Sequence, residues 1–192
     1  GEYSNLIDFT IDSERKTFYM LDSVNKIIKT GMNGDFILEK KVPGDYNRIQ
    51  DIIAHKGIAY GASGQQPGIG KKYQIIQFDK DLNPVGYSLP YLFSFPGTLR
   101  YGNRFYRYNN KINFVSVFEN KIYSESDGTF SERYVFNVEN KGLDLKDLTS
   151  DRFLMNIKGV YLFSYCVEGD DMIFMPMFYD GRPRMGIVQK CA

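Results

Sequence analysis

A short segment at the start of the chain returns later with the same pattern. Residues 1–8 read Gly-Glu-Tyr-Ser-Asn-Leu-Ile-Asp, and residues 44–51 read Gly-Asp-Tyr-Asn-Arg-Ile-Gln-Asp. A repeat of roughly 40–50 residues in a strand-rich chain is typical of propeller blades. Because one such unit cannot bury both of its faces, it needs neighbouring units to stack against. The repeat therefore predicts an all-β array of stacked sheets.

Strand and turn signals divide the chain into four units. Apolar and polar residues alternate through 6–12, as expected for a strand with one covered face. Asn33-Gly34 and Asp127-Gly128 favour tight hairpins, because these residues tolerate a positive φ. We expect one β-propeller-like domain over residues 1–192, built from about four four-stranded antiparallel blades. The expected blades are residues 1–43, 44–90, 91–137 and 153–192, with 138–152 as a linker.

Composition excludes some functions and leaves others open. The formal net charge is only +1, which argues against nucleic acid as a partner because phosphate binding needs a clustered positive surplus. No apolar run approaches the roughly 20 residues of a transmembrane helix. Aromatic residues make up 16% of the chain, all of them Tyr or Phe, and we expect them to pack between blades.

Several motifs together resemble a known family. Gly1–Tyr3, Asp8-Phe9, Phe18–Asp22, Asn33-Gly34 and the stretch Lys111–Tyr123 occur in the order and spacing of the NHL-related six-bladed β-propellers among the cell-envelope lipoproteins of Bacteroidetes. The resemblance covers most of the chain. It implies an exported, lipid-anchored protein of the periplasm or outer surface, without an assigned activity or catalytic residue.

The family has six blades, whereas the sequence here indicates four. The chain is therefore either a fragment of a six-bladed propeller or a shortened relative. An incomplete ring would leave apolar blade faces open, and a homodimer could then cover them.

Candidate catalytic residues are few. His55 is the only histidine, and it lies in a predicted turn with no G-x-S-x-G nucleophile motif elsewhere in the chain. Asp8 and Asp51 occupy equivalent repeat positions, and we expect their side chains to make the same hydrogen bonds between strands or blades. Turn aspartates elsewhere are expected to cap their own backbone. Whether the chain is an enzyme stays open, with a non-catalytic role favoured.

No metal or cofactor is expected. Glu168–Asp171 carries oxygen ligands suited to calcium but lacks the spacing of a calcium loop, so we favour an acidic hairpin tip. Cys166 and Cys191 form no C-x-x-C motif, which argues against structural zinc. They are either a disulfide, as exported proteins allow, or two separate thiols.

Two classes of function remain. The first is a binding or interaction module for a protein or glycan of the cell envelope. Tyr101–Tyr108, which reads YGNRFYRY, would suit its contact surface, although we favour an amphipathic strand whose arginines extend to solvent. The long loop 63–70 is either mobile or functional. The alternative is a glycoside hydrolase or lactonase-like propeller that uses carboxylates lining the channel.

Overall fold

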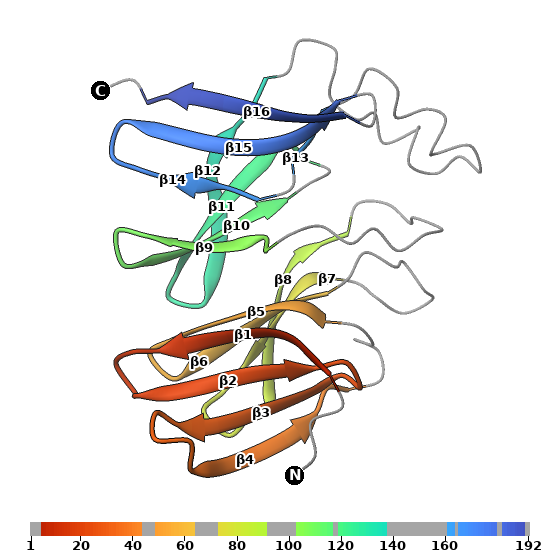
Figure 1. Cartoon of the computed structure of the whole chain (residues 1–192), viewed down its shortest axis with the longest axis vertical. Coiled ribbons are helices and arrows are strands. Elements are labelled where there is room, and N and C mark those ends of the chain that lie inside the picture. The colour runs from red at the N-terminus through yellow and green to blue at the C-terminus, as the bar shows by residue number, and fades with distance from the viewer. Residues whose placement is uncertain are drawn as a thin grey trace, which may run out of the picture. The chain divides into compact units, whose positions relative to one another are not determined.

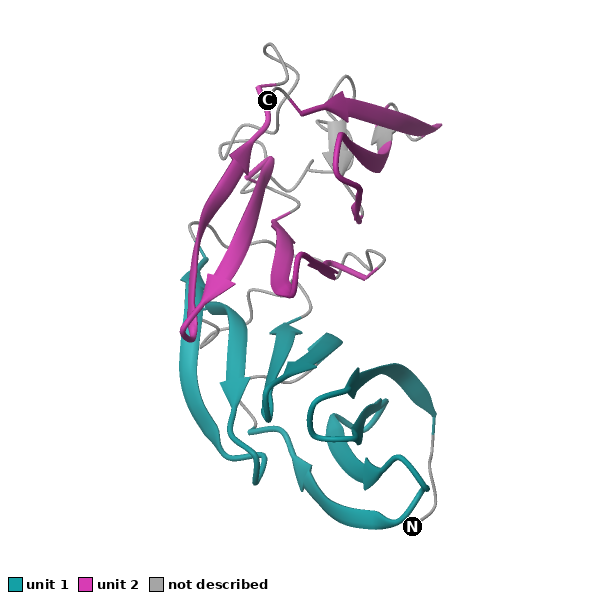
Figure 2. Cartoon of the chain, turned by 90° about the vertical axis from the view of Figure 1, so that its left-hand side faces the viewer, with its two compact units in different colours: residues 1–92, 97–100 teal, residues 93–96, 101–192 magenta. Residues whose placement is uncertain are grey.

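The computed structural model describes residues 5–43, 49–63, 73–91, 103–116, 119–137, 161–163, 165–179 and 182–190. Every regular element in these ranges is a β-strand, and neighbouring strands pair antiparallel in four four-stranded sheets (Figure 1). The predicted fold class is therefore confirmed. The chain divides into two compact units, which are described separately: residues 1–92 with 97–100, and residues 93–96 with 101–192 (Figure 2).

Unit 1 contains two sheets, and in each sheet the strands pair in the order of the sequence. The first sheet consists of β1 (Leu6–Asp12), β2 (Thr17–Asp22), β3 (Lys26–Gly31) and β4 (Phe36–Lys41). The second sheet consists of β5 (Ile49–His55), β6 (Ile58–Ser63), β7 (Tyr73–Phe78) and β8 (Pro84–Pro90). Short turns suffice because consecutive antiparallel strands lie side by side.

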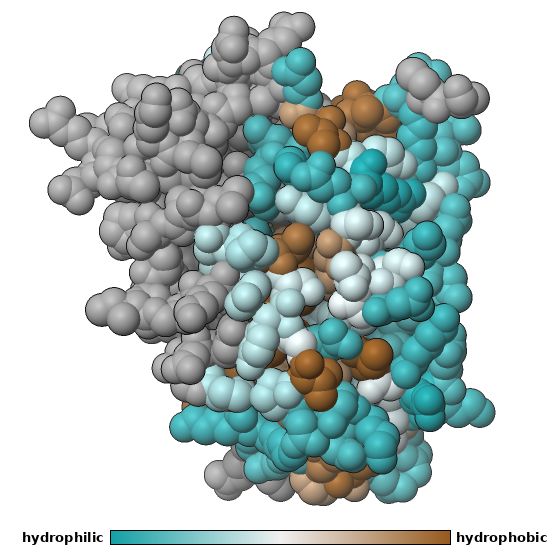
Figure 3. All heavy atoms as spheres, turned by 180° about the vertical axis from the view of Figure 1, so that it is seen from behind, coloured by the Kyte–Doolittle hydropathy of each residue, from teal (hydrophilic) through white to brown (hydrophobic). Residues whose placement is uncertain are grey.

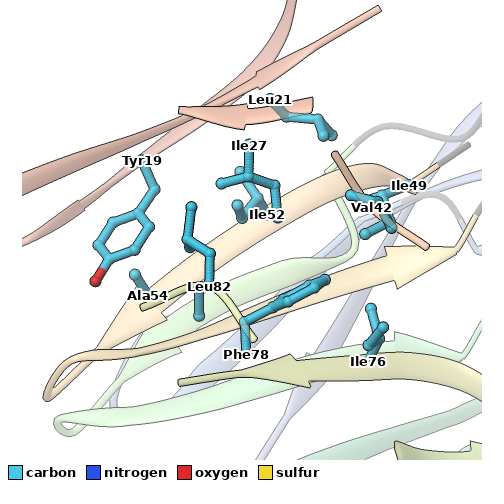
Figure 4. Close-up of a cluster of buried hydrophobic side chains, with 11 residues drawn as sticks. Tyr19, Leu21, Ile27, Val42, Ile49, Ile52, Ala54, Ile76, Phe78 and Leu82 are labelled. Atoms are coloured by element: carbon cyan, nitrogen blue, oxygen red, sulfur yellow. The ribbon is translucent and has the colours of Figure 1, made fainter. Parts of the chain in front are cut away.

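A largely aliphatic core joins the two sheets of unit 1. Its members from the first sheet include Tyr19, Leu21 and Ile27, and the second sheet contributes Ile52 and Phe78, all of them buried. Figure 4 shows these side chains gathered in the space between the strands. Burying several large apolar side chains at once is the dominant favourable term for such a joint.

The side chains of β1 bind the backbone of β5. Asp8 Oδ2 accepts a hydrogen bond from the Ile52 amide at 2.7 Å, and Thr10 Oγ1 accepts one from the Ala54 amide at 3.3 Å. Asp12 Oδ2 accepts another from the Gly57 amide at 2.5 Å. Alternation places these three acceptors on the same side of the strand. The prediction that Asp8 forms a hydrogen bond between strands or blades is therefore confirmed, and the matching bond predicted for Asp51 stays a prediction.

The opposite side of β1 is apolar and exposed. Phe9 keeps 56% of its surface in solvent, Ile7 keeps 45%, and Phe36 on β4 is exposed as well. The alternation predicted for residues 6–12 is present, but the polar side is the covered one. It is covered because β5 offers backbone amides there, and carboxylate and hydroxyl oxygens satisfy them.

Unit 2 contains the other two sheets. The third sheet consists of β9 (Phe105–Tyr108), β10 (Lys111–Ser116), β11 (Lys121–Ser126) and β12 (Thr129–Val135). The fourth sheet consists of β13 (Tyr161–Phe163), β14 (Val167–Glu168), β15 (Met172–Tyr179) and β16 (Arg182–Gln189). Both β13 and β14 pair with β15, on the side opposite β16.

A smaller core lies within unit 2. It is formed by Val115 and Ile122 from the third sheet, by Ile173 and Met175 from the fourth, and by Cys166, which directly precedes β14. Tyr106, Tyr134, Phe136, Met177 and Val188 pack around it and are only partly buried. This joint is therefore richer in aromatic and sulfur-containing side chains than the joint of unit 1.

The predicted turn chemistry is present at Asp127-Gly128, whereas at Asn33-Gly34 only Gly34 has a positive φ, of 88°. Asp127 and Gly128 have φ values of 50° and 81°, the two positive values that a type I′ hairpin requires. Several sequence-based expectations lie outside the described residues. These are the strands expected at 97–101 and 153–157, the loop 64–70, the linker 138–152 and the turn at Gly181.

Apolar side chains also reach the surface of the fourth sheet. Val167, Met172, Phe174, Met185 and Ile187 are all exposed. The pairing registers of β14 and β16 with β15 place Val167 and Ile187 on the same face as Phe174. On one view of the molecule, apolar residues form separate brown patches among polar ones (Figure 3). Within the described ranges, no helix has the length and apolar character needed to cross a bilayer.

Candidate functional site

A fully buried carboxylate lies between the two sheets of unit 2. The Glu168 side chain has 0% exposure, and its Oε1 lies 2.7 Å from both Arg133 Nη2 and Lys190 Nζ. Tyr106 Oη donates to Glu168 Oε2 at 2.9 Å, and Tyr134 Oη donates to Oε1 at 3.1 Å. Two cations and two phenols thus replace the water that a buried carboxylate loses. We call these five residues the Glu168 cluster.

A β-bulge explains how two consecutive residues reach the same carboxylate. Along β11 and β12, Ile122 pairs with Tyr134 but Tyr123 pairs with Glu132, which leaves Arg133 as the extra residue. A bulge twists its strand and redirects side chains that would otherwise alternate between faces. Arg133 also donates from Nη1 to Asn113 Oδ1 at 2.8 Å, so the guanidinium is held from both sides.

Aromatic rings surround the cations of the Glu168 cluster. Lys190 Nζ lies 4.0 Å from the ring centre of Tyr108, and the Arg133 guanidinium lies 5.0 Å from the same ring. The ring of Tyr134 lies 4.9 Å from Arg133. Tyr108 Oη in turn donates to Asp170 Oδ1 at 2.9 Å. Cation–π contacts of this kind stabilise positive charge that is partly removed from water.

The protonation states favour a static arrangement. Burial, together with the neighbouring Cys166 and Glu168, raises the pKa of Tyr106 well above its usual value, so its hydroxyl stays a donor. Burial likewise raises the pKa of the Cys166 thiol to about 12, which removes it as a nucleophile near neutral pH. Partial desolvation of Lys190 is outweighed by its hydrogen bond to Glu168, and its pKa is raised.

A cavity of about 340 Å³ adjoins the Glu168 cluster. Ser124 lines it, and its buried Oγ has no hydrogen-bond partner among the described residues. Glu132 also lines it and forms an ion pair with Lys121. Side chains with hydrogen-bonding groups therefore contribute to the wall of the cavity. The full lining is Tyr108, Asn109, Lys111, Ser124, Ser131, Glu132 and Arg133.

The structure corrects the expectation for Glu168–Asp171. Asp170 and Asp171 are exposed at a hairpin tip, as predicted, but Glu168 is buried and ion-paired. The difference arises because the Glu168 side chain, on β14, contacts Arg133, Tyr106 and Tyr134 of the third sheet. No group of three or more potential metal ligands occurs among the described residues. Cys166 is a buried free thiol, and Cys191 lies outside the described residues.

Residues 103–108, the described part of the segment Tyr101–Tyr108, include buried as well as exposed side chains, which fits an amphipathic strand better than a wholly exposed contact surface. Arg104 is only 1% exposed, and its guanidinium lies 5.3 Å from the ring centre of Phe114. Tyr106 contacts Glu168 and Tyr108 lines the cavity, while Arg107 is exposed. The segment therefore contributes Tyr106 and Tyr108 to the site, and the sequence analysis had singled out this group of tyrosines.

Other candidates lie elsewhere. His55 ends β5 in unit 1 and is half-buried, and the lining of the cavity includes no histidine. Asp51 is buried on the same strand. Arg133 and Lys190 were not identified from the sequence. The signal for Arg133 is weak, because a single basic residue within a strand usually marks a solvated face.

Comparisons with solved structures support the propeller-like fold. A predicted exported protein of Bacteroides fragilis matches with a TM-score of 0.79 and 15% identity, covering 98% of this chain and 56% of that one. BamB from Moraxella catarrhalis matches with a TM-score of 0.57 and 10% identity, over 96% and 53% of the two chains. The C-terminal WD40 domain of Sif2 gives a TM-score of 0.50 and 9% identity, over 96% and 46%.

This chain thus spans about half the length of the structures it matches. At such low identity these likenesses concern the fold alone.

A search of curated protein sequences gives no match. One family matches over residues 1–192, under the description "Domain of unknown function (DUF4934)". Because the match covers the whole sequence, the chain belongs to the DUF4934 family.

Proposed function

We propose that this chain is a non-catalytic binding module of an exported protein of the bacterial cell envelope, and that it binds its ligand in the cavity of unit 2. The likeness to a predicted exported protein supports the location. Lipid anchoring, kinship with NHL propellers and the assembly of residues 1–192 into one propeller-like domain belong to the same proposal. The envelope partner is a glycan or a protein.

The observation that carries the proposal is the state of the carboxylates around the cavity. Glycoside hydrolysis needs two carboxyl groups about 5–10 Å apart, one to donate a proton and one to act as nucleophile or base. Glu168 is already bound by Arg133 and Lys190, and Glu132 is paired with Lys121. Fixed polar groups beside a cavity suit binding, so we assign no catalytic residue, metal or cofactor.

Filling the cavity provides the test. Ser131→Trp places an indole in the lining of the cavity, and Ser13→Trp is the control in an exposed turn of unit 1. Both variants and the wild type would be applied to an array of bacterial envelope glycans. We expect the wild type and Ser13→Trp to bind the same glycans and Ser131→Trp to lose them. Equal binding by all three would refute the cavity as the site, and release of shorter sugars would favour the hydrolase.

A second candidate is docking of a protein on an open sheet face. It is favoured by the exposed apolar side chains of the fourth sheet, among them Phe174, Met185 and Ile187. Light scattering across a dilution series would measure whether the chain forms a dimer. A mass that falls on dilution for the wild type, but is already monomeric for Ile187→Lys, would support this contact. A constant monomer would refute self-association.

A further inference from the structure

We infer that the cavity of unit 2 takes a hydroxylated monocarboxylate, of the kind presented by a uronic acid residue of an acidic glycan. This inference rests on the proposed binding function and adds the chemical class of the ligand. Three properties of the cavity carry it: one cation without a counterion, hydroxyl groups available for hydrogen bonds, and a volume suited to a single sugar.

The first property is an unbalanced positive charge. Lys121 is paired with Glu132, and both Arg133 and Lys190 are paired with Glu168. Lys111 also lines the cavity, and it has no ion-pair partner among the described residues. A ligand with one negative charge would balance Lys111 without disturbing the existing pairs.

The engagement of Arg133 argues for a carboxylate in preference to a phosphate. Its Nη1 donates to Asn113 and its Nη2 donates to Glu168, so the two-pronged face that grips a dianion is already occupied. Lysine acts instead as a point charge with three donors, which is sufficient for one carboxylate. A phosphate would bring nearly twice the charge to the same single free cation.

The second property is the supply of hydroxyl and amide groups. Ser124 Oγ is buried and finds no hydrogen-bond partner in the described part of the chain, and a buried hydroxyl left in that state is costly. Ser131 and Asn109 also line the cavity, and each can both donate and accept. Sugar hydroxyl groups are donors and acceptors as well. A polyhydroxylated ligand could therefore satisfy Ser124 while its carboxylate binds Lys111.

The third property is size. Pockets for small ligands usually measure about 300–1,000 Å³, and this cavity of about 340 Å³ lies near the lower end of that range. It suits one monosaccharide residue better than a nucleotide or a long oligosaccharide. A larger glycan would place only its terminal uronic acid in the cavity.

Ligand-observed NMR titrations with three probes would test the inference on the whole chain. The probes are D-glucuronate, D-glucose and D-glucose 6-phosphate, which share one ring and differ at a single carbon. The key variant is Lys111→Met, and its control is Lys41→Met, which changes an exposed lysine of unit 1. Ser124→Ala tests the hydroxyl. Thermal unfolding of each variant would establish that it remains folded.

We expect glucuronate to bind more tightly than either other probe. Lys111→Met should weaken glucuronate binding at least about tenfold, since hydrogen bonds to charged groups are the stronger class, and should leave glucose unchanged. Ser124→Ala should weaken both sugars, and Lys41→Met should weaken neither. Tighter binding of glucose 6-phosphate would overturn the choice of a carboxylate.

Two further outcomes separate this inference from the proposed function. If glucose binds as tightly as glucuronate and Ser131→Trp abolishes both, the cavity is a binding site but the charge is not recognised, and only the inference fails. If no probe binds and the glycan array shows no ligand sensitive to Ser131→Trp, the inference and the proposed site fail together.

Discussion

The two units join their sheets by different chemistry. In unit 1, side-chain oxygens of β1 accept hydrogen bonds from the backbone of β5, above a largely aliphatic core. In unit 2, the main polar contacts run from side chain to side chain around the Glu168 carboxylate, among aromatic rings. The first joint fixes the position of a strand, and the second fixes the position of functional groups.

This difference explains why the candidate site lies in unit 2. Contacts to backbone amides satisfy obligatory polar groups and leave few side chains free for a ligand. A cluster of ion pairs instead holds charged side chains rigidly beside open space, which is the preorganisation that binding requires. The same cluster should make unit 2 the more sensitive to changes of charge, and unit 1 the more sensitive to changes of shape.

The largest effect is expected from Glu168→Gln. The substitution keeps the shape of the side chain but leaves Arg133 and Lys190 without their shared carboxylate in a largely buried setting. Breaking a buried pair in this way typically costs about 3–5 kcal/mol. Because both cations keep some contact with solvent, we expect a loss of about 3 kcal/mol in the free energy of unfolding, measured by urea titration.

The matched control is Glu39→Gln in unit 1. Glu39 pairs with Lys26 at 3.0 Å but is well exposed, and exposed pairs contribute about 0–1 kcal/mol. Similar losses for the two variants would mean that burial of Glu168 adds nothing, and the contrast between the units would then be wrong.

Two glycines test the sensitivity to shape. A Cβ at Gly61 would lie 2.6 Å from Ile49 Cδ1 and 3.3 Å from Ile76 Cγ2, and both isoleucines are buried and branched. A Cβ at Gly186 would meet Met177 Cε, the far end of a flexible side chain that can move aside. Overpacking of a rigid core costs about 1–3 kcal/mol. We expect Gly61→Ala to destabilise by about 2 kcal/mol and Gly186→Ala by clearly less.

Thermal unfolding of both variants measures the difference. Equal shifts of Tm would show that the core of unit 2 is as rigid as that of unit 1. A larger shift for Gly186→Ala would reverse the comparison.

Much of the fold could be predicted because its signals are local. The repeat, the alternation in β1 and the turn at Asp127-Gly128 each depend on a few neighbouring residues. The side of β1 that is covered could not be predicted in the same way. Burial of Thr10 and Asp12 depends on the amides of β5, which belong to a different sheet.

The candidate site was harder to predict for a related reason. Tyr106 and Glu168 are far apart in the sequence, and Arg133 reaches Glu168 through a bulge that shifts the pairing register. Composition marked Tyr101–Tyr108 as notable, and acidity marked Glu168–Asp171. Neither signal indicated that the two segments meet, because long-range pairing is not encoded in local periodicity.

A smaller effect is expected from Asp8→Ala. It removes the acceptor of the Ile52 amide, and leaving a buried donor unsatisfied costs about 1–3 kcal/mol. Since Asp8 lies at the less covered end of β1, we expect about 1 kcal/mol, measured by urea titration. Asp8→Asn keeps a carbonyl acceptor and should lose less. Equal losses would mean that the carboxylate charge, and not the acceptor, matters.

The smallest effect concerns two lysines with opposite pKa shifts. Burial lowers the pKa of Lys29 in unit 1, although the Asp81 carboxylate opposes the shift, and Lys29 Nζ donates to the Lys80 carbonyl at 2.8 Å. The pKa of Lys190 in unit 2 is raised, because its hydrogen bond to Glu168 outweighs the cost of desolvation. The two lysines should therefore contribute to the pH dependence of stability with opposite signs.

The signs follow from proton linkage. At a pH between the lowered pKa of folded Lys29 and the usual lysine value of about 10.4, the unfolded chain binds more protons at this site than the folded chain. The free energy of unfolding therefore rises with pH, because the folded protein no longer carries a charged lysine that is partly removed from water. The favourable contribution of Lys190 is complete below about 10.4 and is lost as pH rises through its higher folded pKa. The stability lost on Lys190→Met and the stability gained on Lys29→Met should both shrink as the pH rises from 8 to 11. The reason is that Lys190 makes the free energy of unfolding fall as pH rises, whereas Lys29 makes it rise. Titrating groups common to all the proteins cancel in these differences. If both differences stay constant with pH, neither lysine is perturbed, and the two joints do not differ in how they hold a positive charge.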